Sequence, residues 1–433
     1  MDGMTLALVF GALLATLALG FWVSTTLLVI GIMTMVLFTP APVGSVMVTT
    51  IWGASTSWGL TALPLFIWMG EILFRSKLSE NLFAGLSVWL TRIPGRLIHV
   101  NVLGCAVFAA VSGSSAATSA TVGKISLPEL RSRGYDERIS VGTLAGSGTL
   151  GLMIPPSIMM IVYGIAAEVS IGRLFIAGIF PGILLVALFM GYVILWSIMN
   201  PAGIPDVREE DRLSLPEKIR KLRLLLPVIL LIGGVIGSIY TGVATASEAA
   251  ALGVLGSLLL SLFSGTLNWK TFVESVEGAV KTGCMLTFIL VCAAFLSKAM
   301  GFTGIPQALA SSISDFNLTP LTLLVVLTLF YLILGCFLDG ISIVVVTTPM
   351  VLPMVMAAGI DPLWFGIYIV LVTEMAQITP PIGLNLFVLQ GMTGHSIWFV
   401  SKVTFPLFIA LLLAIVVVAI FPELALYLPR AMS

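Results

Sequence analysis

Charged residues are scarce in this sequence. Asp, Glu, Lys and Arg make up 9% of its 433 residues, whereas hydrophobic residues make up 59%. A soluble domain carries about 25% charged residues, so this composition excludes an ordinary soluble protein and indicates an all-α polytopic membrane protein surrounded by lipid. The net charge is zero and no basic tract alternates with aromatic residues, so nucleic acid is not an expected partner.

Histidine and cysteine are also rare, with two and four copies. The cysteines stand alone in apolar stretches, without the spacing of a metal or redox site, and are interpreted as packing residues. The HExxH, GxSxG and GxxxxGKS/T motifs are all missing from the sequence. We therefore expect neither an enzyme nor an ATP-driven pump, and no cofactor other than a coupling ion.

Two Pro-Pro pairs interrupt apolar runs, at Pro155 with Pro156 and at Pro380 with Pro381. At the offset that separates the pairs, three further residues find partners: Pro128 matches Pro353, and Phe180 with Pro181 matches Phe405 with Pro406. A single fixed offset that joins several prolines predicts two structural repeats.

Each repeat has the same order of features. An apolar segment reaches a small polar tip, "VSGSSAATSATVG" in the first repeat and "GCFLDGISIVVVTT" in the second, and a return segment ends in Leu-Pro before the broken helix. Charged residues flank the first tip too closely for either arm to make a full crossing. The pattern predicts a re-entrant hairpin in each repeat, entering and leaving on one face.

Lys and Arg predict the orientation, because short cytoplasmic loops carry the excess positive charge. If the first hairpin opens to the cytoplasm, the basic loop 200–223 lies there too, and Arg173, Lys298 and Arg430 lie outside. The flanks of the second hairpin, "SDFNLTP" and "AAGIDPL", hold no Lys or Arg, so it is expected to open outward. Repeats of inverted topology are typical of secondary transporters.

The prolines also release backbone oxygens. Because proline cannot donate a hydrogen bond to the carbonyl four residues earlier, we expect free carbonyls at Gly151, Leu152, Ala376 and Gln377, with nearby hydroxyls on Ser147, Thr149, Thr373 and Thr379. Hard oxygen ligands near mid-depth suit a dehydrated Na⁺. A proline kink repaired by a neighbouring Ser or Thr explains one isolated break equally well, but duplication opposite two polar tips favours an ion site.

Each break is also expected to begin a new half-helix, with Pro at the first position and Thr379 as the N-cap in the second repeat. Each tip begins another, near Ser114 and Gly340. Helix N-termini carry unpaired N–H groups and partial positive charge, so four of them converging are predicted to hold an anionic group without any Lys or Arg.

Two carboxylates lie in the apolar second repeat, Asp339 at the tip and Glu374 before the break. Ionisable side chains inside a membrane are functional candidates, here as ligand, cation partner or proton carrier. For Asp339 the alternative is a structural cap of the half-helix that begins at the tip. For Glu374 the alternatives are a structural pair or a position nearer the interface.

Several motifs closely resemble the large membrane subunit of tripartite ATP-independent periplasmic (TRAP) transporters, in the order of that family and over nearly the whole chain. They are "ALPLFIWMGEIL", "VSGSSAATSA", "IPPSIMMIVYG" with "SIGRLFIAGIFPG", "TASEAAALG", "GCFLDGISIVVVTTPMVLP", "GIDPLWFGI" and "TPPIGLNLFV". The resemblance implies a Na⁺-driven importer of organic acids, commonly C4-dicarboxylates or sialic and other sugar acids. It also implies a fold of the ion transporter superfamily, in which a mobile transport part moves as an elevator against a scaffold.

The resemblance implies partners, sites and a location as well. The partners are a small four-helix membrane subunit and a periplasmic substrate-binding protein; this chain lacks four extra spans, so the small subunit is expected as a separate polypeptide. The expected location is the bacterial or archaeal inner cytoplasmic membrane, with both termini periplasmic. The implied substrate residues are Ser114, Ser115, Asp339, Gly340 and Asn385. One implied Na⁺ site holds Ser112, Gly113, Ser115, Thr149, Gly151, Leu152 and Pro155, and the other holds Gly335, Gly340, Thr373, Ala376, Gln377 and Thr379.

Repeats and resemblance together predict five segments. We expect N-terminal scaffold helices at 1–78; repeat 1 at 79–199, with an arm helix, a hairpin at about 97–131, a broken helix at about 138–168 and a following helix; a charged cytoplasmic loop at 200–223; scaffold helices and a second arm at 224–300; and repeat 2 at 301–433, with a hairpin at about 319–356, a broken helix at about 362–393 and a C-terminal helix.

Two other functions stay open at this point. One is a self-sufficient Na⁺- or H⁺-coupled dicarboxylate symporter of the same superfamily, and the less favoured one is an ion channel. Inverted hairpins that meet at mid-depth favour alternating access over a continuous pore. The first tip reads "SGSSAATSA", without the acidic residue that many family members carry a few positions further on, so the identity of the acid cannot be borrowed from a relative.

Overall fold

The computed structural model describes residues 3–76, 78–206, 214–304, 319–381 and 383–432. All regular structure in these ranges is helical, including the 3₁₀ turns η1 (Arg96–Ile98) and η2 (Pro201–Gly203). The α-helices are α1 (Gly3–Ala18), α2 (Val23–Phe38), α3 (Val43–Ser55), α4 (Trp58–Phe74), α5 (Leu78–Leu90), α6 (His99–Ser112), α7 (Ser115–Ser132), α8 (Glu137–Gly148), α9 (Leu150–Met153), α10 (Ile158–Ala166), α11 (Ile171–Ala177), α12 (Ile179–Met199), α13 (Leu215–Leu222), α14 (Leu226–Tyr240), α15 (Ala246–Phe263), α16 (Trp269–Thr303), α18 (Pro320–Leu334), α19 (Gly340–Ala357), α20 (Pro362–Gln377), α21 (Leu384–Thr393), α22 (Ile397–Ile420) and α23 (Glu423–Ala431).

Within the described ranges, five helices are long and apolar enough to cross a membrane, and three bent helix pairs raise that number to as many as eight. The five are α11 continued by α12, then α15, α16, α19 and α22. The bent pairs are α3 with α4 at 53°, α8–α9 with α10 at 42°, and α13 with α14 at 51°. By length and composition the chain is therefore a multi-span membrane protein.

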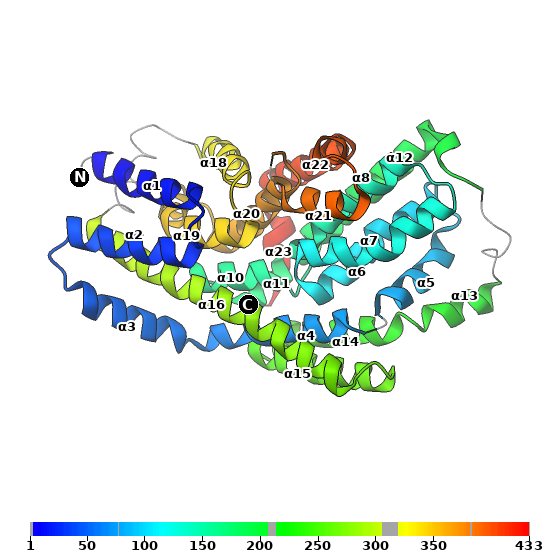
Figure 1. Ribbon diagram of the computed structural model, residues 1–433, viewed down its shortest axis with the longest axis horizontal. Helices are drawn as coiled ribbons and strands as arrows, with labels where there is room; N and C mark the ends of the chain where they lie inside the picture. The colour runs from blue at the N-terminus through cyan, green and yellow to red at the C-terminus, as the bar shows by residue number, and fades with distance from the viewer. Residues whose placement is uncertain (1–2, 77, 207–213, 305–318, 382, 433) are drawn as a thin grey trace.

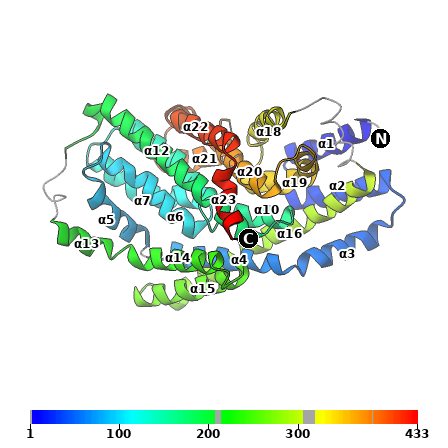
Figure 2. The same ribbon diagram turned by 180° about the vertical axis from the view of Figure 1, so that it is seen from behind.

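The longest helix, α16, has 35 residues and packs against α2, α3 and α4, while α4 also packs against α15. Figures 1 and 2 show α3, α4, α14 and α15 along one long side of the molecule, and α18 and α22 along the opposite side. The hairpins and broken helices lie between these sides. Of these elements, α6 and α10 pack on α4, and α19 packs on α16.

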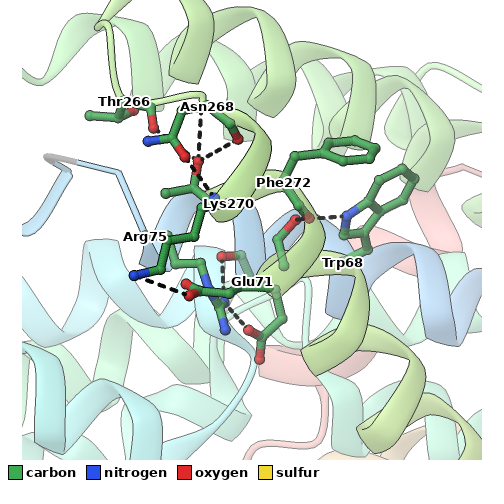
Figure 3. Close-up of polar contacts among 10 residues, drawn as sticks. Trp68, Glu71, Arg75, Thr266, Asn268, Lys270 and Phe272 are labelled. Atoms are coloured by element: carbon green, nitrogen blue, oxygen red, sulfur yellow. Dashed lines mark hydrogen bonds and ion pairs between the residues drawn. The ribbon is translucent and has the colours of Figure 1, made fainter.

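Polar contacts hold α4 against α16 at one point of this layer (Figure 3). Trp68 Nε1 donates a hydrogen bond to Ser275 Oγ at 3.2 Å, and Glu71 pairs with Arg75 one turn along α4. A Cβ added to Gly278 would lie 2.6 Å from Glu71 Oε2, so the two helices meet where α16 has no side chain. Glu71 therefore has a structural role.

Two hairpins and two broken helices form the centre of the fold. Tip 1 (112–115) joins α6 to α7, and tip 2 (335–340) joins α18 to α19. Break 1 (154–157) separates α9 from α10, and break 2 (378–383) separates α20 from α21; both Pro-Pro bonds are cis. The second half of each broken helix packs against the other hairpin, because α10 contacts α19 and α21 contacts α7.

The segment expected as a charged loop, 200–223, is only partly a loop. Its end forms helix α13, because the carboxylate of Glu217 accepts a hydrogen bond from the amide of Ser214 at 2.9 Å and so closes the first turn. Residues 207–213, which include Arg208 and Arg212, lie outside the described residues. Helix α13 and the apolar helix α14 that follows it form one of the three bent pairs that could each be a single span.

Helices α8 and α22 pack closely at Gly142, and a substitution there tests this packing. A Cβ on Gly142 would overlap the carbonyl oxygen of Val403 and lie 2.9 Å from its carbonyl carbon, whereas a Cβ on Gly391 would meet nothing within 4 Å. We expect Gly142→Ala to cost about 1–3 kcal/mol, because backbone cannot move aside as a side chain can. Gly391→Ala, the matched control, is expected to be neutral or to stabilise α21, since Ala favours helix.

Thermal unfolding midpoints of the detergent-solubilised variants measure the difference. Equal midpoints for the Gly142 and Gly391 variants would contradict the close approach of α8 to α22.

Candidate functional site

Tip 1 and break 1 are in direct backbone contact, and two glycines permit it. A Cβ added to Gly151 would lie 2.5 Å from the carbonyl oxygen of Ser114 and 2.6 Å from the amide nitrogen of Ser115. Gly113 has φ +58°, and a Cβ there would lie 3.2 Å from the amide nitrogen of Ile158. A larger residue at 151 would push the tip off the break, so the two halves of the first predicted Na⁺ site are neighbours in space.

The carboxylate of Glu374, in α20 before break 2, crosses to this junction. Glu374 is fully buried. Its Oε1 accepts a hydrogen bond from the amide of Leu152 at 3.0 Å, and Ser115 Oγ lies 3.2 Å from both carboxylate oxygens. Ser115 Oγ also lies 3.3 Å from the carbonyl oxygen of Thr149. One side chain thus links the helix before break 2 to tip 1 and to the segment that leads into break 1.

Other polar groups around tip 1 and break 1 are paired locally. Ser157 Oγ donates to the carbonyl of Leu152, which is one of the carbonyls expected to be free. Ser112 Oγ lies 2.7 Å from Thr118 Oγ1, so this side chain is engaged between tip 1 and α7. Pro155 lies buried in the break and has no side-chain polar atom, so its backbone carbonyl is the only ligand it offers.

Tip 2 also lies against the end of α20. A Cβ on Gly335 would overlap the side chain of Ala376 and lie 3.3 Å from its Cα. A Cβ on Gly340 would lie 2.5 Å from Gln377 Nε2. Tip 2 and the end of α20, the two parts of the second predicted Na⁺ site, are therefore neighbours in space, again through glycines that leave room for a close approach.

The hydroxyls predicted for that site turn back to their own helix. Thr373 Oγ1 donates to the carbonyl of Ile369 at 2.7 Å, and Thr379 Oγ1 donates to the carbonyl of Met375 at 2.8 Å. The carbonyl of Ala376 accepts from the amide of Thr379 at 3.1 Å. In the structure these groups complete the last turn of α20, which is the repair expected after a proline break.

The prediction that the prolines begin the new half-helices, with Thr379 as N-cap, is wrong. Helix α10 begins at Ile158 with Ser157 as its cap, whose Oγ accepts from the amide of Met160 at 3.3 Å. Helix α21 begins at Leu384 after Gly383. A residue before proline avoids the helical conformation, and Ile154 is extended with ψ 123°, so two prolines in a row lengthen the unwound stretch.

Asp339 is the N-cap of α19. Its Oδ2 accepts hydrogen bonds from the amides of Ile341 at 3.1 Å and Ser342 at 3.2 Å, and its other oxygen accepts from the Ser342 hydroxyl. The side chain is exposed. Of the roles considered from the sequence, the structure supports the cap directly.

Polar atoms without partners lie buried on α7, α8 and α21. Asn385, on α21, is fully buried, and neither atom of its amide group has a hydrogen-bond partner among the described residues. The hydroxyls of Ser119 on α7 and Ser147 on α8 are buried and likewise unpartnered in the described part of the chain. Ser114 caps α7 by accepting from the amide of Ala117 at 3.4 Å. Buried unpaired amides are costly, so Asn385 is suited to a ligand.

Glu374 is a functional candidate from its sequence position, but it is not among the residues predicted for the ion and substrate sites. The signal was present, since a carboxylate in an apolar run is expensive unless it is paired. Its partners could not be read from the sequence, because Ser115 and Leu152 lie in the other repeat. The glycine contacts at 113 and 151 became visible only from the packing.

Two polar tips packed against two unwound breaks, in a bundle of spanning helices, define a membrane transport protein. The sequence matches the family described as "Tripartite ATP-independent periplasmic transporter, DctM component" over residues 10–424. The chain therefore belongs to this family of TRAP transporter large permeases, and the expected TRAP membership is confirmed.

Named relatives support the same family. The chain is 34% identical over 401 residues to the C4-dicarboxylate TRAP transporter large permease protein DctM of Pseudomonas aeruginosa, covering 92% of each chain. It is 30% identical to the sialic acid permease SiaM of Vibrio cholerae, covering 87% of this chain and 88% of the relative. It is 32% identical to the ectoine permease TeaC of Halomonas elongata, covering 85% and 86%.

A solved structure shares the fold. The YdaH transporter of Alcanivorax borkumensis superposes with a TM-score of 0.65, covering 96% of this chain and 98% of that one, at 15% sequence identity. At this identity the likeness concerns the arrangement of helices alone.

The Glu374 contacts can be tested through stability. Glu374→Ala removes one of the two acceptors of the Leu152 amide and of the Ser115 hydroxyl, each of which also donates to the Thr149 carbonyl. We expect a loss of about 2 kcal/mol or more, because hydrogen bonds to a buried carboxylate are lost and a cavity is left between α20 and tip 1. Glu374→Gln keeps one acceptor oxygen and should lose less. Glu277→Ala, which removes an exposed carboxylate paired with Lys281, serves as the control and should not measurably change the unfolding midpoint. A midpoint equally unaffected in Glu374→Ala would contradict a structural link between α20 and tip 1.

Asp339 can be tested through the cap. We expect Asp339→Asn to preserve substrate uptake, because Asn is as good an N-cap as Asp, and Asp339→Ala to reduce stability by about 1 kcal/mol. Uptake assays and unfolding midpoints on both variants separate the roles. Loss of uptake in Asp339→Asn with an unchanged midpoint would assign the carboxylate to the substrate or to a proton rather than to the cap.

Proposed function

We propose that this chain is the large permease of a Na⁺-coupled importer that carries an organic acid across the inner membrane. The observation that carries the proposal is the junction of tip 1, break 1 and Glu374. There, a hydroxyl, backbone carbonyls and a carboxylate meet in a buried setting. Oxygen ligands of this kind suit Na⁺, and unwound helices at mid-depth are where secondary transporters bind ions and substrate.

The first Na⁺ site is proposed between Ser115 and the carbonyls of Thr149 and Gly151, because these groups are neighbours in the structure. The second is proposed between tip 2 and the end of α20, where Gly335 and Gly340 approach Ala376 and Gln377. At the first site Gly151 lies against the backbone of Ser114 and Ser115. At the second, Gly335 lies against Ala376 and Gly340 against the side-chain amide of Gln377, and the hydroxyls of Thr373 and Thr379 hold the shape of the turn.

The substrate is proposed to lie between the two tips. Helix α7 begins there, and the N-terminus of a helix favours a carboxylate; the N-terminus of α19 is already capped by the Asp339 carboxylate. The unpartnered amide of Asn385 supplies a specific polar contact. C4-dicarboxylates and sialic acid, after which two of the relatives are named, are compounds that contain carboxylates. Ectoine, after which a third relative is named, extends the range of acids to consider.

The mechanism is proposed to be an elevator with inverted repeats. Helix α10 of repeat 1 contacts α19 of repeat 2, and helix α21 of repeat 2 contacts α7 of repeat 1. This correspondence between the two contacts supports inverted repeats. The layer of α3, α4, α15 and α16 provides the scaffold, and α6 to α12 with α18 to α22 provide the moving part. A small four-helix membrane subunit and a periplasmic substrate-binding protein are the proposed partners, and both termini are proposed to lie in the periplasm.

Uptake of radiolabelled organic acids into proteoliposomes tests the function. The vesicles hold this chain with its small subunit, and a panel of C4-dicarboxylates, sialic acid and ectoine is offered with and without an inward Na⁺ gradient and the binding protein. We expect uptake of one class of acid that requires both, because ion binding and substrate delivery are separate steps. Dissipating the gradient with a Na⁺ ionophore is the control.

Uptake that needs the gradient but not the binding protein would replace the proposal with a self-sufficient symporter. Uptake that is indifferent to Na⁺ would remove the coupling ion from it.

A further inference from the structure

A cavity of about 680 Å³ lies between α7, the start of α8 and the end of α21. It is lined by Gly123, Lys124, Arg131, Glu137, Met392 and Thr393, among others. This volume is within the range of small-molecule sites. The cavity belongs to neither predicted Na⁺ site and holds none of the predicted substrate residues.

The charge in this cavity is positive because one lysine has no partner. Arg131 pairs with Glu137, and the same carboxylate lies 3.0 Å from His395 Nε2. Lys124 is exposed, and no acidic side chain in the described part of the chain forms an ion pair with it. An ammonium group facing a cavity attracts a carboxylate, and low-dielectric walls strengthen the attraction.

Two helices connect the cavity with the proposed substrate site. Lys124 lies nine residues after Ser115 on α7, or about 13 Å along the helix, and Met392 lies seven residues after Asn385 on α21, or about 10 Å. Because α7 and α21 pack against each other, both lead from the site to the same cavity. It lies on the side that the distribution of Lys and Arg predicts to be cytoplasmic.

Flexible side chains form the wall of the cavity beside Gly123. A Cβ on Gly123 would lie 2.7 Å from Met392 Cε and 2.7 Å from Leu144 Cδ2, so both side chains rest on the bare backbone of α7. A thioether has several accessible rotamers and moves at little cost. At Gly123 the contact between α7 and α21 is therefore made by a movable methionine side chain on a bare stretch of α7.

We propose that this cavity is an exit vestibule, in which Lys124 receives the carboxylate of the transported acid as it leaves the tips for the cytoplasm. The inference rests on the proposed function, since it assumes that an organic acid is carried inward. It assigns Lys124 a binding role that is distinct from the substrate residues at the tips. Arg131 stays neutralised by Glu137, so the ammonium group is the attracting charge.

Amine labelling of the purified full chain tests the vestibule without requiring transport. An amine-reactive ester is applied in detergent, and the labelling rates of Lys124 and Lys402 are read by mass spectrometry with millimolar succinate or with chloride at equal ionic strength. We expect succinate to slow the labelling of Lys124 about fivefold, the size of one charge–charge contact near a surface, and to leave Lys402 unchanged. Lys402 is a matched control because it is also exposed and does not line the cavity.

Equal labelling of Lys124 in succinate and chloride overturns the proposal. Protection by phosphatidylglycerol micelles but not by succinate also overturns it and makes the cavity a lipid headgroup site. Protection by succinate in a protein that shows no Na⁺-dependent uptake of any acid would support the vestibule and refute the coupled importer, so the two failures are distinguishable.

Variants then connect the cavity with transport. Proteoliposomes loaded with increasing internal substrate report how strongly the cytoplasmic side competes. We expect Lys124→Ala to raise the internal concentration that halves uptake by about fivefold, with the external half-saturation unchanged, Lys124→Arg to restore it, and Lys402→Ala to behave as the unmodified chain. Equal shifts on both sides in Lys124→Ala would indicate a general structural defect and overturn the assignment.

Discussion

The structure depends on how the backbone groups freed at the two breaks are satisfied. In a membrane no water is available for an unpaired N–H or C=O, so every unwound residue needs a protein partner. At break 1 the partners come both from nearby and from the other repeat. The Leu152 carbonyl accepts from Ser157 in the break itself, and the Leu152 amide is shared between the Thr149 carbonyl and Glu374 of the other repeat. The fold around break 1 therefore depends on a side chain from the second broken helix.

This requirement ties three parts of the molecule together. Tip 1 touches break 1 through Gly113 and Gly151, and Glu374 holds Ser115 from the side of break 2. A change at any one of these groups alters the hydrogen bonds of the others, since they share one carboxylate. In the proposed transporter, such shared contacts would let an ion at a break influence a substrate at a tip.

Local features of the sequence predicted much of this site. Pro-Pro pairs identified the breaks, because proline lacks an N–H wherever it occurs, and small polar residues identified the tips. The details that failed were also local in origin. Thr379 was expected to cap a helix that begins at the prolines, but the residue before each proline avoids the helical region and the new helix begins later. The loop expected at 200–223 contained a capped helix.

The sequence by itself determined the membrane class, the two breaks, the two tips and the family, because hydropathy, proline chemistry and motif order are properties of residues near one another in the chain. Only the tertiary structure decided the partners of the polar side chains. Glu374 meets Ser115 and Leu152, Asp339 closes the first turn of α19, and Lys124 faces a cavity. A polar group is satisfied by whatever the fold brings within about 3 Å of it, and sequence distance does not encode that proximity.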